Sequence, residues 1–325
     1  SGGQNLLYDG GDQSHADLII SYLQEQNVEN IDYMIASHYD EDHIGGLVPC
    51  IDNFSVSNIF GPDYVHTSNL FNNFMNTVTA NAIIVQYPSV GETFDFGTGS
   101  FTVLAPNGIS QNSNDNSLVI KLENGSNSFI FTGDAEETSE QDMISTGMNL
   151  DCDVLSLGHH GSASSTSWDL LEAYTPSWAV ISCGQDNSYG HPAASTMEKL
   201  RDMNIPVYRT DAQGTIIALS DGDTISWNQE PCNDYAAGDA KQQSANSDTS
   251  QAAQYSSEDT ASAPAVETET PDISSDTQGR TVWISATGSK YHSRPDCGNM
   301  NPNKATQETE AQALSQGYEA CKKCW

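Results

Sequence analysis

The segment 36-ASHYDEDHIGG-46 carries two histidines and three carboxylates between His38 and His43. Carboxylates this close repel one another, so the cluster predicts a bound cation. Imidazole nitrogens and carboxylate oxygens together suit zinc, manganese or iron. The segment follows an apolar run and precedes Gly45-Gly46, which indicates a loop at the end of a buried strand. A solvated acidic loop is the alternative interpretation, and the two bracketing histidines argue against it.

Three further segments repeat this arrangement, in which an apolar strand runs into an aspartate or a histidine. They are 129-FIFTGDAEE-137 with Asp134, 155-LSLGHHGSASS-165 with His159 and His160, and 187-NSYGHP-192 with His191. Taken singly, these residues have structural explanations as a turn, a helix start and a loop. Because four strands end in the same way, we expect the groups to line one edge of a packed pair of sheets.

Up to residue 227, short apolar strands predominate and helical stretches lie between them. Hairpins are predicted at residues 97–99 and at Asn124-Gly125. The pattern predicts an α+β fold in which two sheets pack face to face with helices outside.

Acidic residues dominate the charge of the chain, which has 325 residues and a net charge of −33. Residues 1–227 hold 30 acidic and four basic side chains, a net of −26. Such a domain repels nucleic acid and anionic membranes at low salt, unless bound metal cancels the charge locally. Solubility in a salty or extracellular medium is the simpler reading of this charge. No apolar run approaches the roughly 18 residues of a membrane span, so we expect no such span.

The motifs SHYDEDHIGG, FTGDAE, HHGSASSTS and YGHP, in this order, resemble the metallo-β-lactamase superfamily. They resemble more closely the extracellular hydrolase domain of the competence protein ComEC and its secreted relatives. The resemblance implies a four-layer αβ/βα sandwich with two divalent ions, zinc or manganese, at one edge of the sheets. It implies that Asp42 or another carboxylate orients the attacking hydroxide and that His191 faces the substrate as an acid or an anion ligand. The implied metal ligands are His38 and Asp40 for one ion, Asp42 and His43 for the other, Asp134 as the bridge, and the His159-His160 pair.

The chain departs from the family pattern at two ligand positions. Asp40 stands where the commonest pattern has a second histidine, although ComEC-like members also carry aspartate there. The histidine before the TGD hairpin is absent and 114-NDNS-117 stands in its place, so Asn116 or a water is expected to fill that position. The chain also starts with what looks like the second arm of a hairpin, so we expect an upstream strand to have been removed.

The sequence divides into three parts. Residues 1–229 form the predicted hydrolase domain, and residues 230–279 form a Ser/Thr/Ala/acidic linker that is too poor in apolar residues to fold. Residues 280–325 are too few to form a stable fold without a disulfide or a bound metal. They carry H-x4-C followed by C-x2-C, which suits one structural zinc, with a disulfide plus a spare thiol as the alternative. The expected zinc ligands are His292, Cys297, Cys321 and Cys324.

This C-terminal part resembles the zinc-binding domain of Ada-type DNA-repair proteins, with His292 where that family has a cysteine. A site with a histidine is less nucleophilic than one with four thiolates, so we expect a docking module rather than a methyl acceptor.

The leading hypothesis is a secreted or cell-surface bacterial metallohydrolase, a monomer, that acts on phosphodiesters. Nucleic acid, a smaller phosphodiester and a cell-surface phosphate polymer are the candidate substrates. The alternatives are hydrolysis of another ester, a thioester or a lactam, and a non-enzymatic extracellular binding protein with a structural metal.

Overall fold

The computed structural model describes residues 1–238, 281–284, 290–294, 297, 305–309, 313 and 318–321. The chain divides into two compact units, Ser1–Ala240 and Lys241–Trp325. Among the described residues, no helix is both long and apolar enough to cross a membrane.

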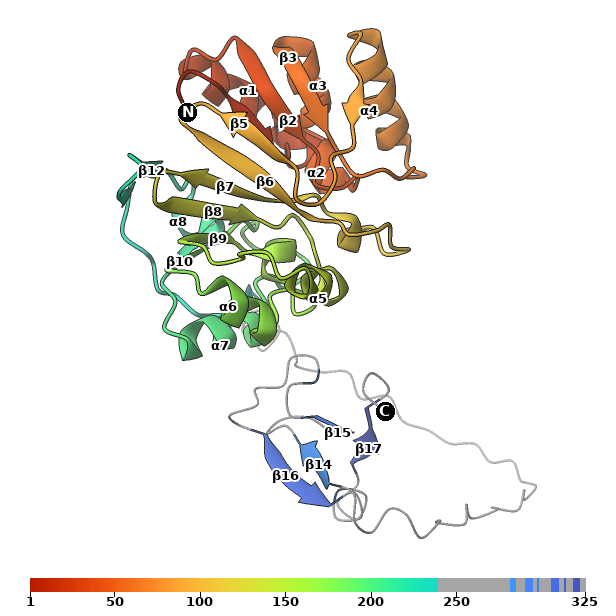
Figure 1. The fold of residues 1–325 in the computed structure, drawn as a ribbon, viewed down its shortest axis with the longest axis vertical. Helices are drawn as coiled ribbons and strands as arrows, with labels where there is room; N and C mark the ends of the chain where they lie inside the picture. Colours follow the sequence, from red (N-terminus) through yellow and green to blue (C-terminus); the bar gives the residue numbers. More distant parts are fainter. Residues whose placement is uncertain are drawn as a thin grey trace, which may run out of the picture. The chain divides into compact units, whose positions relative to one another are not determined.

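The first unit contains two main sheets (Figure 1). The first sheet is parallel and has the order β1-β2-β3-β4, formed by Leu6–Tyr8, Asn30–Ile35, Ser55–Phe60 and Val85–Gln86. The second sheet has the order β11-β10-β9-β8-β7-β6-β5. Its antiparallel half comprises β5 (Thr93–Phe96), β6 (Gly99–Ala105), β7 (Val119–Asn124) and β8 (Asn127–Phe131). Strands β9 (Val154–Ser156), β10 (Trp178–Ile181) and β11 (Val207–Arg209) continue it in parallel with β8. A separate hairpin is formed by β12 (Ala218–Ser220) and β13 (Ile225–Trp227).

Helices cover the outer face of each sheet and complete the four-layer αβ/βα sandwich predicted from the sequence (Figure 1). Helices α1 (Ala16–Glu25), α3 (Leu47–Asn53) and α4 (Asn69–Ala80) pack on the first sheet. Helices α5 (Glu137–Ser145), α6 (Trp168–Tyr174) and α7 (Ala194–Asp202) pack on the second. The short helices α2 (Glu41–Ile44) and α8 (Thr210–Gln213) and the 3-10 turns η1 (Gln13–His15), η2 (Asn114–Asn116) and η3 (Gly158–Gly161) lie in connections.

Strand alternation separates the buried side chains into layers. On β2, Ile35 points between the sheets and packs with Phe60 and Phe101, whereas Met34 points outward and packs with Phe74 of α4. Successive side chains of a strand face opposite sides, so β2 serves two cores at once. Both faces are therefore apolar, which leaves the ends of the strands for polar groups.

The first unit extends past residue 229, where the sequence places the start of the linker. The guanidinium of Arg209 is fully buried and donates to the carbonyl oxygens of Asp234 (3.0 Å) and Ala236 (2.5 Å). The backbone N–H of Gly238 donates to the carbonyl of Pro192 at 2.8 Å. The segment 231–238 is thus folded onto the hydrolase unit. The rest of the predicted linker lies outside the described residues.

The second unit contains a small sheet of order β16-β14-β15-β17. Its strands are β14 (Thr281–Ile284), β15 (Lys290–His292), β16 (Thr306–Thr309) and β17 (Glu319–Ala320). Val282, Ile284, Tyr291 and Ala313 form a minor apolar cluster.

Candidate metal centre

The predicted site residues meet where four strands end. Strand β2 leads to His38, β8 to Asp134, β9 to the His159-His160 pair and β10 to the loop of His191. Parallel strands deliver their carboxyl ends to the same edge of a sheet, which is where such folds place ligands. The sequence-predicted cluster is therefore brought together by topology.

Three buried atoms at the centre lack hydrogen-bond partners within the described part of the chain. They are Nε2 of His38, Nε2 of His43 and Oδ1 of Asp134. The Nε2 of His43 lies 3.2 Å from Asp134 Oδ1, and the His38 and His43 rings are 4.1 Å apart. All three residues offer ligand atoms within 4.8 Å of one another. Buried polar atoms are normally paired, so two unpaired nitrogens and a carboxylate oxygen gathered this closely fit metal ligands.

Asp9 fixes the ring of His43 from behind, and the sequence analysis did not identify it. Its Oδ2 lies 2.8 Å from His43 Nδ1, and its Oδ1 accepts the Ser37 backbone N–H at 2.7 Å. A carboxylate on Nδ1 leaves Nε2 as the ligand atom. Burial acts to lower the pKa of His43, but the charges of Asp9 and Asp134 outweigh it and raise this pKa well above its usual value.

Asp42, His43 and His160 form a second group whose ligand atoms lie within 4.8 Å. His160 Nε2 is 3.2 Å from Asp42 Oδ2 and 3.7 Å from Asp134 Oδ1. The other ring nitrogen of His160 lies 2.8 Å from the carbonyl oxygen of Ser182, which fixes the tautomer. The hydrogen bond from His160 lowers the pKa of Asp42 to about 2.

His159 turns toward the opposite oxygen of the same aspartate. Its Nε2 is 3.7 Å from Asp134 Oδ2, and its Nδ1 is 3.1 Å from Glu136 Oε1. Both histidines of the pair have left-handed backbone, with φ of 49° at His159 and 54° at His160. This unusual backbone sends consecutive side chains to the two sides of Asp134.

Asp40 lies at the rim on the His38 side. Its Oδ2 is 3.7 Å from His38 Nε2, and its Oδ1 is 3.6 Å from His66 Nε2. His66 comes from the loop between β3 and α4 and was not predicted. Its Nδ1 bonds Ser68, the N-cap of α4, at 2.9 Å.

The His191 ring lies beside the rings of His159 and His160 and makes no hydrogen bond to a carboxylate of the described centre. Its ring centroid is 5.4 Å from that of His159, and the exposed Tyr189 ring stacks on it at 5.7 Å. Burial and then the charges of His159 and His160 lower its pKa. A neutral imidazole at the rim is suited to contact a substrate rather than a carboxylate.

Comparison with known proteins identifies the family. Residues 1–184 match the model of the metallo-β-lactamase superfamily, more than half of the chain. The chain belongs to this superfamily. Its members are generally metal-dependent hydrolases, and the donor set above agrees with that chemistry.

Three relatives are competence proteins of the ComEC type. ComE operon protein 3 of Bacillus subtilis is 30% identical over 61% of this chain, and Recombination protein 2 of Haemophilus influenzae is 33% identical over 66%. Competence protein ComA of Neisseria gonorrhoeae is 30% identical over 66%. The matched region spans 26%, 26% and 29% of these relatives, so the chain corresponds to less than a third of their length.

Asn116 does not take the place of the histidine that the metallo-β-lactamase pattern has before its TGD hairpin. Its Oδ1 accepts the Ser110 N–H at 2.6 Å, and its Nδ2 donates to the Ser110 carbonyl at 3.1 Å. Because both ends of the amide are engaged with Ser110, the expectation that Asn116 substitutes as a ligand is wrong. The imidazole that faces Asp134 Oδ2 is that of His159, at 3.7 Å.

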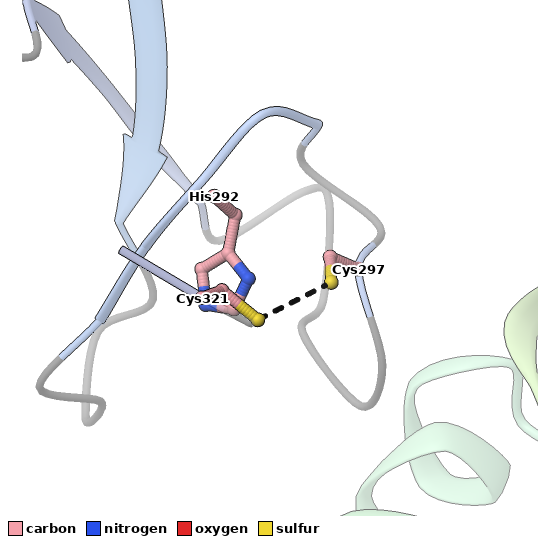
Figure 2. A group of neighbouring side chains, drawn as sticks. All are labelled: His292, Cys297 and Cys321. Carbon is pink, nitrogen blue, oxygen red and sulfur yellow. Dashed lines mark hydrogen bonds between the residues drawn. The ribbon is translucent and has the colours of Figure 1, made fainter. Parts of the chain in front are cut away.

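The second unit holds a separate candidate group, His292, Cys297 and Cys321 (Figure 2). The two sulfur atoms are 3.8 Å apart, well beyond the roughly 2.05 Å of a disulfide. Burial and then Lys290 lower the pKa of His292, which favours the neutral imidazole that a metal needs. Cys324, the fourth ligand predicted, lies outside the described residues.

Proposed function

We propose that the first unit is a binuclear metal-dependent phosphodiesterase that works outside the bacterial cell or at its surface. The observation that carries the proposal is the convergence of unpartnered, buried Nε2 atoms of His38 and His43 on Asp134 Oδ1. A solvated acidic loop does not bury such groups, because the desolvation of unpaired polar atoms is costly.

The two oxygens of Asp134 divide the ligands into two sets. Oδ1 faces His43 and His160, and Oδ2 faces His159. The family resemblance pairs His38 with Asp40 and Asp42 with His43. We add His159 to the first pair and His160, which lies 3.2 Å from Asp42 Oδ2, to the second, so that Asp134 would lie between two ions. Zinc and manganese both accept this mixture of nitrogen and oxygen donors.

When bound, a pair of divalent ions supplies a hydroxide at neutral pH and neutralises charge on a phosphoryl oxygen. The chain supplies orientation. Asp42, more than half exposed, directs the attacking water. Neutral His191 contacts the phosphoryl group as a hydrogen-bond donor, because its lowered pKa disfavours the imidazolium that would be needed to protonate the leaving oxygen. The dense carboxylates then serve to hold cations that compensate their repulsion.

The competence relatives favour a phosphodiester over a lactam or a thioester as the substrate, and they support nucleic acid. The net charge of −26 within residues 1–227 repels a long polyanion, which favours a smaller phosphodiester or a cell-surface phosphate polymer instead. For the second unit we propose one structural zinc on His292, Cys297, Cys321 and Cys324, in a docking module.

The test is hydrolysis of bis(4-nitrophenyl) phosphate by the full chain supplied with Mn²⁺ or Zn²⁺, beside a chromogenic lactam and a thioester. We expect turnover of the phosphodiester alone. Asp134→Asn is expected to abolish it without unfolding the protein, because the amide keeps the shape of the carboxylate. Turnover of the lactam or the thioester instead would reassign the substrate. No turnover of any of the three, together with a lower melting temperature of Asp134→Asn, would favour the binding protein with a structural metal.

A further inference from the structure

Glu136 is the centre of a hydrogen-bond cluster beside the metal centre. Its Oε1 lies 2.7 Å from Ser164 Oγ and 3.1 Å from His159 Nδ1. The same carboxylate accepts from the side-chain amides of Asn114 (3.2 Å) and Asn112 (2.9 Å). Four donors from two separate segments of the chain, residues 112–114 and 159–164, thus converge on one carboxylate.

The four histidines of the centre differ in what holds their Nδ1 atoms. His43 has the carboxylate of Asp9, His160 has the carbonyl of Ser182, and His38 has the hydroxyl of Ser37. His159 has Glu136. Its own backbone is left-handed and lies in a short turn, so the turn provides no regular helix or strand to orient the ring.

We infer that Glu136 is a positioning residue for His159, and that through it Glu136 controls the ion on the Oδ2 side of Asp134. By accepting the Nδ1 proton, Glu136 leaves the lone pair on Nε2, the atom that faces Asp134 Oδ2 at 3.7 Å. The inference rests on the proposed binuclear site. The positioning of His159 matters most on the Oδ2 side of Asp134, because Asn116 provides no ligand on that side.

The dependence is one-sided. The other ion is held by Asp42, His43 and His160, whose ring partners are Asp9 and Ser182, so Glu136 contacts none of that set. Loss of Glu136 should therefore weaken one ion and spare the other. A purely structural role for Glu136, as a link between loops, would weaken both ions together.

The experiment is Mn²⁺ titration of the full chain followed by calorimetry and electron paramagnetic resonance. Mn²⁺ prefers oxygen and nitrogen ligands, so the thiolates of the second unit do not compete for it. A pair of close ions gives a spin-coupled signal, and a single ion gives six lines. The variants are Glu136→Ala, Glu136→Gln and the control Glu172→Gln, an exposed residue on α6.

We expect two Mn²⁺ per chain in the wild type and in Glu172→Gln. Glu136→Ala should bind one ion about 10–100-fold more weakly, keep the other within twofold, and show six lines at one equivalent. Glu136→Gln keeps an oxygen acceptor for His159 and should lose less affinity than the alanine variant. Wild-type binding in Glu136→Ala, or loss of both ions with a lower melting temperature, would overturn the inference. A wild type that binds no Mn²⁺ or Zn²⁺ in its first unit would overturn the proposed function as well.

Discussion

Two buried charged side chains, Glu140 and Lys199, hold the segment before α6 against the helices α5 and α7. Glu140 of α5 accepts the backbone N–H groups of Thr166 (2.5 Å) and Ser167 (2.9 Å), and Lys199 of α7 donates to the carbonyl of Thr166. Both charged side chains are at most 2% exposed. Burial raises the pKa of Glu140 and lowers the pKa of Lys199 to about 8, with Glu140 partly opposing the latter.

We predict that Lys199→Met lowers the free energy of unfolding by about 1–3 kcal/mol at pH 7, because it leaves the buried carbonyl of Thr166 without its donor and removes the cation nearest to Glu140. Glu140→Gln removes the other charge and leaves Lys199 buried without an anion. The double variant should therefore lose about 1–3 kcal/mol less than the sum of the single variants.

The pH dependence of the free energy of unfolding follows from the lowered pKa of Lys199. The fall from 10.5 to about 8 corresponds to about 3 kcal/mol, at about 1.36 kcal/mol per pKa unit. Between these two values the unfolded chain keeps the Lys199 proton while the folded chain has released it, so the contribution of Lys199 to stability rises with pH. Lys199→Met lacks this rise, and its destabilisation relative to wild type should be about 2 kcal/mol larger at pH 10 than at pH 7.

Urea denaturation of the full chain, followed by far-ultraviolet circular dichroism at both pH values, measures these differences. The matched control is Arg201→Met on the same helix, whose surface ion pairs should be worth less than about 1 kcal/mol. The reasoning is refuted if Lys199→Met is as stable as this control, or if the single losses simply add in the double variant.

Three further perturbations probe other parts of the molecule. Gly46→Ala would place its Cβ 1.9 Å from the carbonyl oxygen of Gly10, so it should lower the melting temperature strongly, whereas Gly108→Ala, with open space around it, should not. The pKa values of His43 and His160 are raised, so a bound metal must displace the protons of these rings. The affinity for Mn²⁺ should therefore rise about tenfold per pH unit for each proton displaced. Calorimetry in two buffers of different ionisation enthalpy should detect the released protons. A pH-independent affinity would contradict this. Cys321→Ser should remove one zinc per chain in elemental analysis and leave Mn²⁺ binding unchanged; an unaltered zinc count would contradict the assignment.

The four-layer sandwich and most of the candidate ligands could be predicted because their signals are local. Each apolar run ends in a short motif, as with His38 after β2 and Asp134 after β8. Periodicity identifies the strands, and parallel topology brings their ends together. The division into two ion sites comes from the family resemblance of these motifs and stays a prediction.

The supporting residues could not be predicted in the same way. Asp9 lies 34 positions before the His43 ring that it holds, and no spacing rule connects them. His66 follows a glycine-proline loop without a motif of its own. Glu136 lies inside a quoted motif, but its contacts come from two distant segments.

The contacts of residues 234–238 with the first unit could not be predicted for a related reason. The composition of residues 230–238 is polar and rich in alanine and acids, as in a linker. What folds the segment is the buried Arg209, a single long-range partner that satisfies two backbone carbonyls. Composition measures the apolar content of a segment and does not register such a partner.

The most direct test of the binuclear hydrolase is a joint measurement of Mn²⁺ stoichiometry, phosphodiester turnover and melting temperature in the wild type and in Asp134→Asn. The account predicts two Mn²⁺ and turnover in the wild type, and in the variant a folded protein that has lost turnover and the spin-coupled pair. Wild-type protein that binds fewer than two ions, or an Asp134→Asn variant that still turns over the phosphodiester, would contradict it.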